Sequence, residues 1–269
     1  MSTAAVSEMP DQTAPTQDNI VEVRNITKYY GEDIHALDSI NLGFPTGQMT
    51  TLLGPSGCGK TTLLKIIAGL LEPTEGEVLI NGKPVFGPGP ERAFVFQDFA
   101  LLPWATVIEN VGFGLELTNK FSKAEREEKA KHYINEVGLG GFEYKYPHEL
   151  SGGMRQRVGL ARALVVNAEV LLMDEPFSAV DEQTRRKFQE DLLYLLANEK
   201  KSVIFVTHSI EEAVYVSDQI VLLSPRPGRI HSTIRPQISR DSTPDEIRRD
   251  KRYLDTVEEI WTNLRKYLD

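Results

Sequence analysis

Gly54-Pro55-Ser56-Gly57-Cys58-Gly59-Lys60-Thr61 is the stretch that decides the fold of this chain. It fits G-x-x-x-x-G-K-[ST], the pattern of a phosphate-binding loop. The short, apolar and β-branched run 49–53 precedes it and predicts a buried strand. Residues 62–71 follow it with apolar side chains at helical spacing. A strand, a glycine-rich loop and a helix start are the context that this pattern requires, so the sequence predicts an α/β core around a nucleotide site.

The loop is suited to capture phosphate through its backbone. Gly54, Gly57 and Gly59 let the chain turn tightly with its N–H groups facing inward, and the helix start adds further donors. Lys60 would reach the terminal phosphates of ATP, and the Thr61 hydroxyl would ligate Mg²⁺. The alternative is a glycine turn with a solvated lysine, since the bare pattern arises by chance in roughly one per cent of chains this long. The residues expected to hold ATP here are Gly54, Pro55, Ser56, Gly57, Cys58, Gly59, Lys60, Thr61 and Thr62.

Composition excludes several classes of protein. The chain has 269 residues, enough for one large domain or for a domain with an inserted lobe. Its net charge of −9 argues against a general nucleic-acid binder, which would present a basic face. The single cysteine, Cys58, excludes an intrachain disulfide and a cysteine metal cluster. Because Cys58 lies within the phosphate loop, we expect ATP to shield its thiol from alkylation.

The pattern along the chain indicates three parts. Residues 1–19 are polar and carry no signal-peptide pattern, so we expect a disordered tail. Residues 20–235 are predicted to form one P-loop NTPase domain, with a β subdomain near its N-terminus. Within this domain, residues 99–150 give no strand signal and are predicted to be an inserted helical subdomain.

Residues 236–269 are predicted to form a C-terminal helical extension. We expect one helix from Asp245 to Leu268 that packs on the body through side chains at rough helical spacing, namely Ile247, Leu254, Val257, Ile260, Trp261 and Leu264. No apolar run in the chain approaches the roughly 18 residues needed to span a bilayer. The protein is therefore expected to stay on the side of the membrane on which it is made.

Two adjacent acids, Asp174 and Glu175, close an apolar strand predicted at 169–173. A parallel sheet presents its site at the carboxyl ends of its strands. Asp174 would hold Mg²⁺ there, usually through water, while Glu175 would polarise the attacking water. The alternative is a pair of acids that merely caps a turn.

Strands predicted at 93–96 and 203–206 also end in polar side chains, Gln97 and His208. Gln97 could orient a water or touch Mg²⁺, and His208 could donate to the γ-phosphate. A plain loop amide and a structural histidine are the alternatives, and the residues alone leave both open.

Two features outside these strand ends could also contact a nucleotide. Tyr30 precedes the phosphate loop and could stack on a base, although its spacing alone favours a strand-end tyrosine in the core. Ser151, Gly152 and Gly153 open a predicted helix, with Ser151 as its N-cap and two glycines that leave the amides open to an anion. Taken alone, this second motif favours an ordinary capped helix.

Taken in order, these motifs resemble those of the nucleotide-binding subunits of ABC transporters. The resemblance covers about residues 20–235 and rests on the phosphate loop, Gln97, L-S-G-G at 150–153, Asp174-Glu175, Ser178 to Asp181, and His208. The chain departs from the family pattern at Met154, where many members have Gln, and at Val180, where Leu is commoner.

The resemblance implies a role for each matched residue. Tyr30 becomes the base-stacking aromatic, Gln97 links Mg²⁺ and water to the membrane partner, and His208 becomes the switch histidine. Ser151, Gly152 and Gly153 would contact the γ-phosphate held by the other protomer, and Asp181 would reach across the dimer. Catalysis is thus assigned to Glu175, His208 and Gln97, and the metal to Thr61, Gln97 and Asp174.

A narrower likeness is to the nitrate/sulfonate/taurine import subgroup, through Leu101-Leu102-Pro103-Trp104, Met154 and the stretch 224–230. It implies an ATPase at the cytoplasmic face of the inner (plasma) membrane that works as a homodimer, or with a paralogous subunit. ATP hydrolysis would drive the uptake of a small solute, an anion such as nitrate, sulfonate or taurine. Its partners would be permease subunits, with a solute-binding protein indirectly involved and no nucleic acid. A soluble P-loop kinase and a non-transport ABC ATPase are the alternative functions. The transported substrate and the permease are not identified by the sequence.

Overall fold

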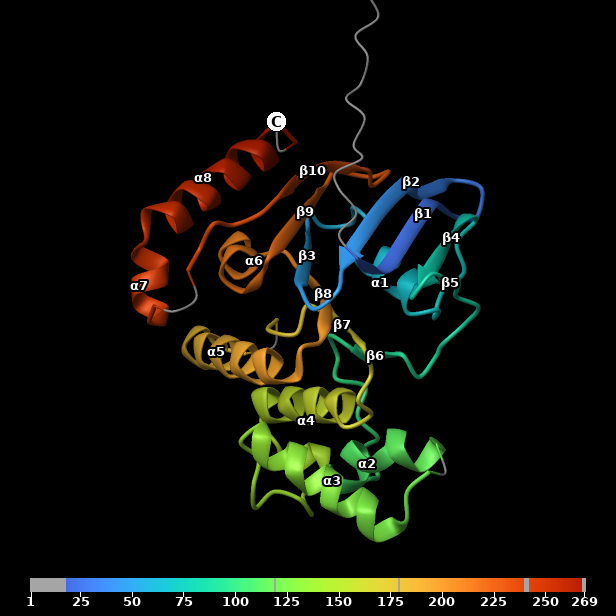
Figure 1. Cartoon of the computed structure of the whole chain (residues 1–269), viewed down its shortest axis with the longest axis vertical. Helices are drawn as coiled ribbons and strands as arrows, with labels where there is room; N and C mark the ends of the chain where they lie inside the picture. The colour runs from blue at the N-terminus through green and yellow to red at the C-terminus, as the bar shows by residue number, and fades with distance from the viewer. Residues whose placement is uncertain (1–17, 119, 179, 240–241, 268–269) are drawn as a thin grey trace, which may run out of the picture.

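The computed structural model describes residues 18–118, 120–178, 180–239 and 242–267 (Figure 1). Residues 1–17 of the predicted tail lie outside this range, and Asn19 already belongs to the first strand. Two β-sheets and their covering helices form the body, and α2 and α3 form a lobe at one end (Figure 1). This α/β arrangement, with a β subdomain near the N-terminus and an inserted helical part, is the fold class that the sequence predicts.

The first sheet is antiparallel, with strand order β2-β1-β4-β5. Asn81 and Gly82 join β4 to β5 in a two-residue hairpin, and both have positive φ, 49° and 70°. Such a turn favours Asn-Gly because both positions are left-handed. The strands are β1 (Asn19–Tyr30), β2 (Ile34–Pro45), β4 (Glu75–Ile80) and β5 (Lys83–Pro84).

The second sheet has strand order β10-β9-β3-β8-β7-β6 and is parallel except for the antiparallel edge strand β10. Its strands are β3 (Met49–Leu53), β6 (Arg92–Val95), β7 (Val170–Asp174), β8 (Ser202–Thr207), β9 (Gln219–Leu223) and β10 (Ile230–Ile234). Leu53 pairs with Thr207, and Asp174 pairs with Val206. The carboxyl ends of the central strands therefore meet at one edge.

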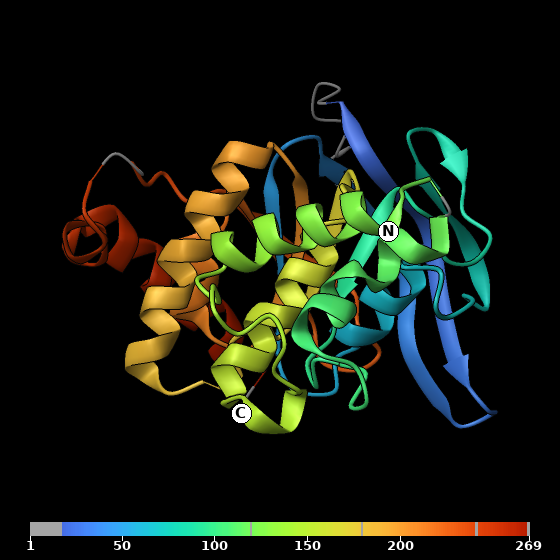
Figure 2. The same cartoon turned by 90° about the horizontal axis from the view of Figure 1, so that it is seen from below.

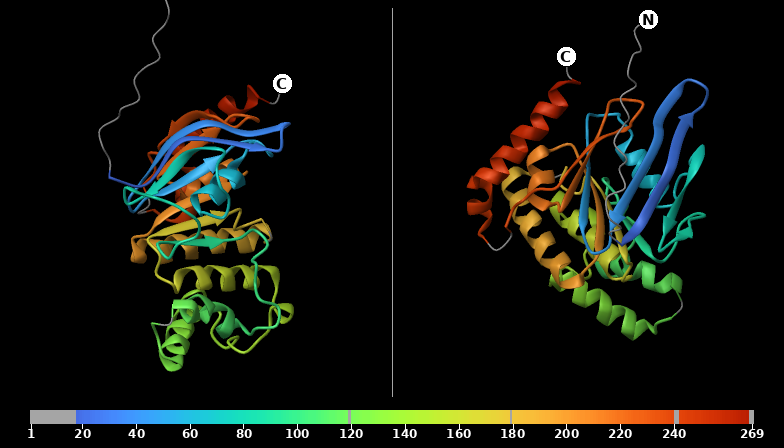
Figure 3. Two further views of the ribbon diagram at one scale, coloured as in Figure 1. Left: turned by 90° about the vertical axis from the view of Figure 1, so that its right-hand side faces the viewer. Right: turned by 45° about the horizontal axis from the view of Figure 1, so that its top comes forward.

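Each face of the parallel sheet has its own core. On β8, Val203 and Phe205 belong to the core that contains the helices α4, α5 and α6. Ile204 and Val206 alternate with them and pack against α1 and the first sheet. Because alternate residues of a strand point to opposite faces, continuous apolar strands are needed here. Helix α1 (Lys60–Ile67) is thus enclosed between the two sheets (Figure 3).

The remaining helices cover the other face of the parallel sheet and form the lobe, which faces the viewer in Figure 2. They are α2 (Val107–Thr118), α3 (Lys123–Glu136), α4 (Gly152–Leu164), α5 (Glu182–Glu199) and α6 (Ile210–Val216), with a 3-10 helix, η1 (Pro147–Glu149). Within the described part of 99–150 there is no strand. None of the helices in the described residues is long and apolar enough to cross a bilayer.

The C-terminal extension differs from the prediction of one helix. It forms α7 (Pro244–Arg249) and α8 (Lys251–Arg265), separated at Asp250, whose ψ is 134° and whose carboxylate accepts from the backbone N–H of Arg252. Leu254 and Trp261 are 53% and 48% exposed, so their predicted packing on the body is wrong. The other four predicted residues do pack on the body: Ile247 and Ile260 are buried, and Val257 and Leu264 are partly buried against the same core. Tyr253, which the spacing did not select, is buried as well. Helical spacing therefore located most of the packed face, but it included the exposed Leu254 and missed the neighbouring Tyr253.

Candidate functional site

The phosphate loop requires glycine at several positions. Gly57 and Gly59 have φ of 76° and 101°, which L side chains rarely adopt. A Cβ on Gly59 would also lie 2.6 Å from the Leu37 side chain, and one on Gly54 would lie 2.8 Å from the Leu223 carbonyl oxygen. Conformation and close packing therefore both fix this loop at the start of α1.

Lys60 is 6% exposed and folds back over its own loop. Its Nζ donates to the carbonyl oxygens of Gly54 at 2.8 Å and Pro55 at 3.0 Å. An ammonium at this place can transfer its hydrogen bonds from these carbonyl oxygens to phosphate oxygens. The arrangement fits the anion that the sequence predicts.

The Cys58 side chain does not face the nucleotide side of the loop. It is 1% exposed and belongs to the core between the two sheets. Burial raises the pKa of the Cys58 thiol, although Lys60 lies nearby. We therefore expect the fold itself, rather than bound ATP, to shield this thiol from alkylation.

We predict that a maleimide labels Cys58 slowly in the native protein, equally with and without Mg·ATP, because both burial and the raised pKa of the thiol suppress attack. Labelling should become fast in denaturant. The measurement is mass spectrometry of labelled protein over time at pH 7 and pH 8. Fast native labelling that ATP suppresses would contradict the buried thiol.

Thr61 and Asp174 form a pair that suits a magnesium ion. The Thr61 hydroxyl donates to the Asp174 carboxylate at 2.9 Å, and Asp174 is 4% exposed. Burial raises the pKa of Asp174, with Glu175 adding to the shift and the Thr61 hydrogen bond opposing it. A cation there would compensate the buried charge. Mg²⁺ usually takes one or two protein ligands and completes its shell with substrate phosphates and water, so this pair would be enough to anchor it.

The three residues predicted to be catalytic come together in space. Glu175 Oε2 lies 3.4 Å from Gln97 Nε2 and 3.2 Å from His208 Nδ1. Glu175 has a φ of 46°, unusual for a residue other than glycine, and this conformation sends its side chain away from that of its neighbour Asp174. One acid faces Thr61 and the other faces Gln97 and His208, as two separate tasks would require.

Tyr30 lies at the end of β1 beside α1. Its ring is not in the core, since the residue is 41% exposed, and its hydroxyl is 3.2 Å from Thr62 Oγ1. The core alternative for Tyr30 is thus wrong. An exposed aromatic ring next to the phosphate loop can stack on a base, and this role stays a prediction.

Ser151, Gly152 and Gly153 are not part of the cluster around Lys60. Ser151 caps α4 by accepting from the Met154 N–H at 3.3 Å. A Cβ on Gly153 would meet the Val180 side chain at 3.1 Å, so this helix start lies beside the segment leading to Asp181. In Figure 1, α4 and α1 lie on opposite sides of β7 and β6.

Asp181 is the N-cap of α5 and accepts from the Thr184 N–H at 3.0 Å. Ala179, two residues before Asp181, lies outside the described residues. The position next to the start of α4 leaves Asp181, like Ser151, away from the phosphate loop of its own chain.

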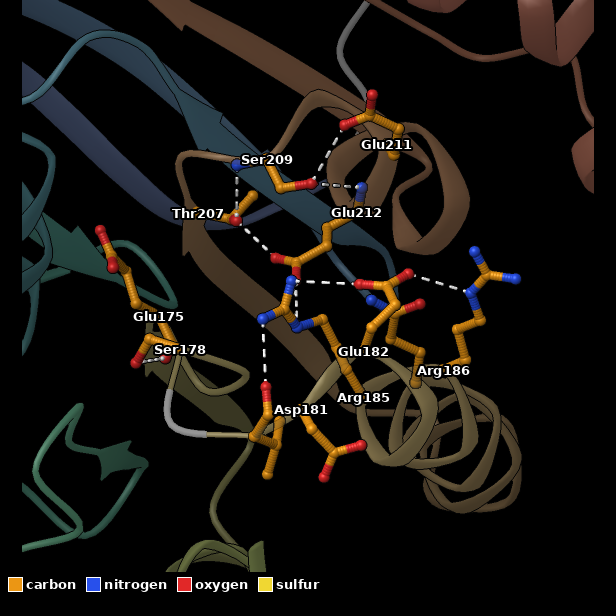
Figure 4. A network of polar contacts seen from close by, with 12 residues as sticks. Glu175, Ser178, Asp181, Glu182, Arg185, Arg186, Thr207, Ser209, Glu211 and Glu212 are labelled. Atoms are coloured by element: carbon orange, nitrogen blue, oxygen red, sulfur yellow. Dashed lines mark hydrogen bonds and ion pairs between the residues drawn. The ribbon is translucent and has the colours of Figure 1, made fainter. Parts of the chain in front are cut away.

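Sequence reasoning missed an ion pair near His208, formed by the buried Glu212 and the partly exposed Arg185 and drawn in Figure 4. Glu212 is 8% exposed and accepts from the Thr207 hydroxyl at 2.5 Å. Arg185 Nε lies 3.7 Å from Glu212, and its Nη2 donates to the Val180 carbonyl oxygen at 3.1 Å. Burial raises the pKa of Glu212. The pair joins the strand end before His208 to the segment before Asp181, and nothing local in the sequence separates Glu212 from the exposed Glu211.

Among protein families, the model of the ABC transporter family matches this chain over residues 37–178. Among similar curated proteins, an uncharacterised ABC transporter ATP-binding protein of Methanocaldococcus jannaschii is 54% identical over 82% of this chain and 83% of its own. A taurine import ATP-binding protein of Chromobacterium violaceum is 50% identical over 79% and 81%. An aliphatic sulfonates import ATP-binding protein of Bacillus cereus is 44% identical over 85% and 93%.

Solved structures of ABC cassettes have the same fold. The dimeric structure of a bacterial ABC transporter cassette has a TM-score of 0.73 at 35% identity, covering 80% of this chain and 98% of that one. A dimeric post-hydrolysis state of the same cassette, bound to ADP and Pi, has a TM-score of 0.72 at 34% identity and the same coverage.

Proposed function

Because this chain belongs to the ABC transporter family, we propose that it is the ATPase subunit of an importer in which two copies hydrolyse ATP to drive solute uptake. One observation carries the catalytic part of the proposal. Glu175 lies between Gln97 and His208, while its neighbour Asp174 contacts Thr61 at the phosphate loop.

The site's chemistry follows from these placements. The loop amides and Lys60 would bind the phosphates of ATP, and Tyr30 would contact the base. Thr61, Asp174 and Gln97 would hold Mg²⁺, which supplies charge neutralisation at the phosphates. Glu175 would accept the proton of the attacking water, with His208 and Gln97 orienting that water and the γ-phosphate.

A second copy completes the site in this proposal. Ser151, Gly152, Gly153 and Asp181 lie away from the phosphate loop of their own chain, and similar cassettes are dimeric. The partner's copies of these residues would then close over ATP, which makes the dimer depend on nucleotide. A paralogous ATPase subunit could take the partner's place.

The similar taurine and sulfonate import proteins point to a small anion as the transported solute, with nitrate included by the subgroup resemblance. We place the subunit at the cytoplasmic face of the inner (plasma) membrane, held there by separate permease subunits. A solute-binding protein would deliver the anion from the other side.

Phosphate release tests the proposal against its alternatives. We expect the purified chain to release inorganic phosphate from Mg·ATP without forming a phosphorylated small molecule. A phosphorylated product would indicate a P-loop kinase instead. Co-purification with membrane proteins is expected, whereas co-purification with nucleic acid or ribosomes would indicate a non-transport ABC ATPase.

Trp104 is the residue that we predict to contact the permease. It is 75% exposed and lies on the loop between Gln97 and α2. Trp104→Ala should weaken assembly with the permease, because a buried interface tryptophan typically contributes about 2 kcal/mol or more, roughly 30-fold in affinity. Pull-down and transport assays measure this, with ATP binding by the isolated chain as the unchanged property.

Phe86→Ala is the matched control for Trp104, since Phe86 is 92% exposed but lies on the loop after β5. It should leave assembly and transport intact. If the Trp104→Ala variant transports as well as wild type, the assignment of Trp104 to the permease contact is wrong.

A further inference from the structure

The segment that follows Gln97 has an unusual backbone conformation. Phe99 and Ala100 have φ of 65° and 44°, so two successive residues other than glycine are left-handed. L-residues rarely adopt this conformation, and it persists only where surrounding contacts impose it. The pair begins two residues beyond Gln97, whose amide lies beside Glu175.

Arg162 of α4 binds the carbonyl groups of both residues. Its Nη1 donates to the Ala100 oxygen at 2.7 Å, and its Nη2 donates to the Phe99 oxygen at 2.8 Å. A planar guanidinium presents its donors in a fixed fork, which suits two acceptors held in one geometry. Burial lowers the pKa of Arg162, but an arginine stays charged in proteins, so the two bonds are charge-assisted.

One face of α4 packs on this turn. Arg155, Gly159 and Arg162 are spaced i, i+4 and i+7, and therefore lie on the same side of the helix. The Arg155 guanidinium is 5.7 Å from the centroid of the Phe99 ring. A Cβ on Gly159 would lie 3.7 Å from the Phe99 carbonyl oxygen. The helix that presents this face begins directly after Ser151.

The far end of the same loop is held by another helix. Asn110 of α2 is fully buried, accepts from the Leu102 N–H at 2.8 Å, and donates to the Leu102 carbonyl at 3.1 Å. It also donates to the carbonyls of Ala105 and Thr106, both at 3.0 Å. Residues 102–106 are thus attached to α2, whereas the part next to Gln97 is attached to α4.

We propose that Arg162 is a positioning residue for Gln97. Arg162 fixes the left-handed turn at Phe99 and Ala100 to α4, the helix that Ser151 caps. The position of the Gln97 amide beside Glu175 therefore depends on the position of α4. A displacement of α4 then moves Gln97 with it. This inference rests on the proposed role of Gln97 in ATP hydrolysis.

Hydrogen exchange on the full chain tests the attachment without any need for hydrolysis. Arg162→Met keeps the apolar stem but removes both donors, so the amide of Phe99, which donates to the Phe96 carbonyl in the native protein, should exchange about tenfold faster or more. The amide of Leu102, which Asn110 of α2 holds, should exchange at its native rate. Arg157→Met is the matched control, since Arg157 of α4 binds the Val137 carbonyl and Asp191 instead. Unchanged exchange at Phe99 in the Arg162 variant would overturn the attachment.

A double-mutant cycle tests positioning through Gln97. Arg162→Met should lower turnover at saturating Mg·ATP, but should lower it little further in the Gln97→Ala background. Arg157→Met should instead lower turnover by the same factor with and without Gln97→Ala, as a general structural effect does. Arg162→Lys, which keeps the charge without the fork, should fall between wild type and Arg162→Met, and it replaces the methionine variant if that one does not fold.

The outcomes separate this inference from the proposed function. Suppose that Gln97→Ala lowers turnover, and that Arg162→Met lowers it by the same factor in the wild-type and Gln97→Ala backgrounds. The positioning role is then wrong, and the proposed function stands. If Gln97→Ala leaves turnover unchanged, the assignment of Gln97 in the proposed function is wrong. Loss of the Arg162 effect in the Gln97→Ala background supports both.

Discussion

Glu175→Gln is expected to lower the turnover of ATP by about 10²- to 10⁴-fold, or roughly 3 to 5 kcal/mol in activation free energy. The substitution keeps the size of the side chain and its hydrogen bonds to Gln97 and His208, but removes the charge that would accept the proton of water. ATP binding should survive, because the phosphate loop and the Thr61–Asp174 pair are untouched. The measurement is phosphate release at saturating Mg·ATP.

The same variant should accumulate as an ATP-bound dimer, because slowed hydrolysis preserves the nucleotide shared between the two copies. Size-exclusion chromatography with and without Mg·ATP measures this. Asp174→Asn is the matched control: it should lose Mg²⁺-dependent binding together with turnover, since its carboxylate contacts Thr61. Ordinary turnover in Glu175→Gln would refute the catalytic assignment. Binding without dimerisation would show that the isolated subunit needs its membrane partner to form the sandwich.

Lys60→Ala should weaken ATP binding by roughly 10- to 150-fold, corresponding to about 1.5 to 3 kcal/mol for hydrogen bonds between charged groups. Turnover should fall by about 10² to 10³, as when one preorganised donor to the developing charge is removed. The Lys60 ammonium is buried against the carbonyls of Gly54 and Pro55, so the alanine variant loses the donor to the phosphates without disturbing the apolar core. Nucleotide titration and phosphate release measure both effects.

Lys83→Ala is the control for that experiment. Lys83 is an exposed lysine on β5, the edge strand of the first sheet. The affinity of this control variant for ATP and its turnover should be within about twofold of wild type. A surface substitution seldom changes a free energy by more than about 0.5 kcal/mol. Wild-type behaviour of Lys60→Ala would refute the assignment of the phosphate loop.

The sequence was informative wherever one local pattern implied one structure. The glycine pattern at 54–61 implied the loop and the helix that follows it. Gln97, Asp174 and His208 could be selected as site candidates because each follows a buried strand, and parallel strands end at a common edge.

Other features were decided by packing. The position of Cys58 in the sequence suggested access to nucleotide, yet its side chain turns into the core between the sheets. Helical spacing correctly selected Ile247, Val257, Ile260 and Leu264, but it also included the exposed Leu254 and Trp261 and missed the buried Tyr253. Periodicity gives the approximate spacing of a packed face but not its edges.

The sequence by itself determined the fold class, the phosphate loop and the chemical types available at the strand ends, because these depend on short-range patterns and on strand order. Only the tertiary structure decided which groups meet: Glu175 with Gln97 and His208, Glu212 with Thr207, and Arg162 with the carbonyls of Phe99 and Ala100. These contacts join residues of separate elements, so their geometry depends on how helices pack on the sheet. A hydrogen bond requires placement to within a few tenths of an ångström, and no local pattern specifies that between distant parts of a chain.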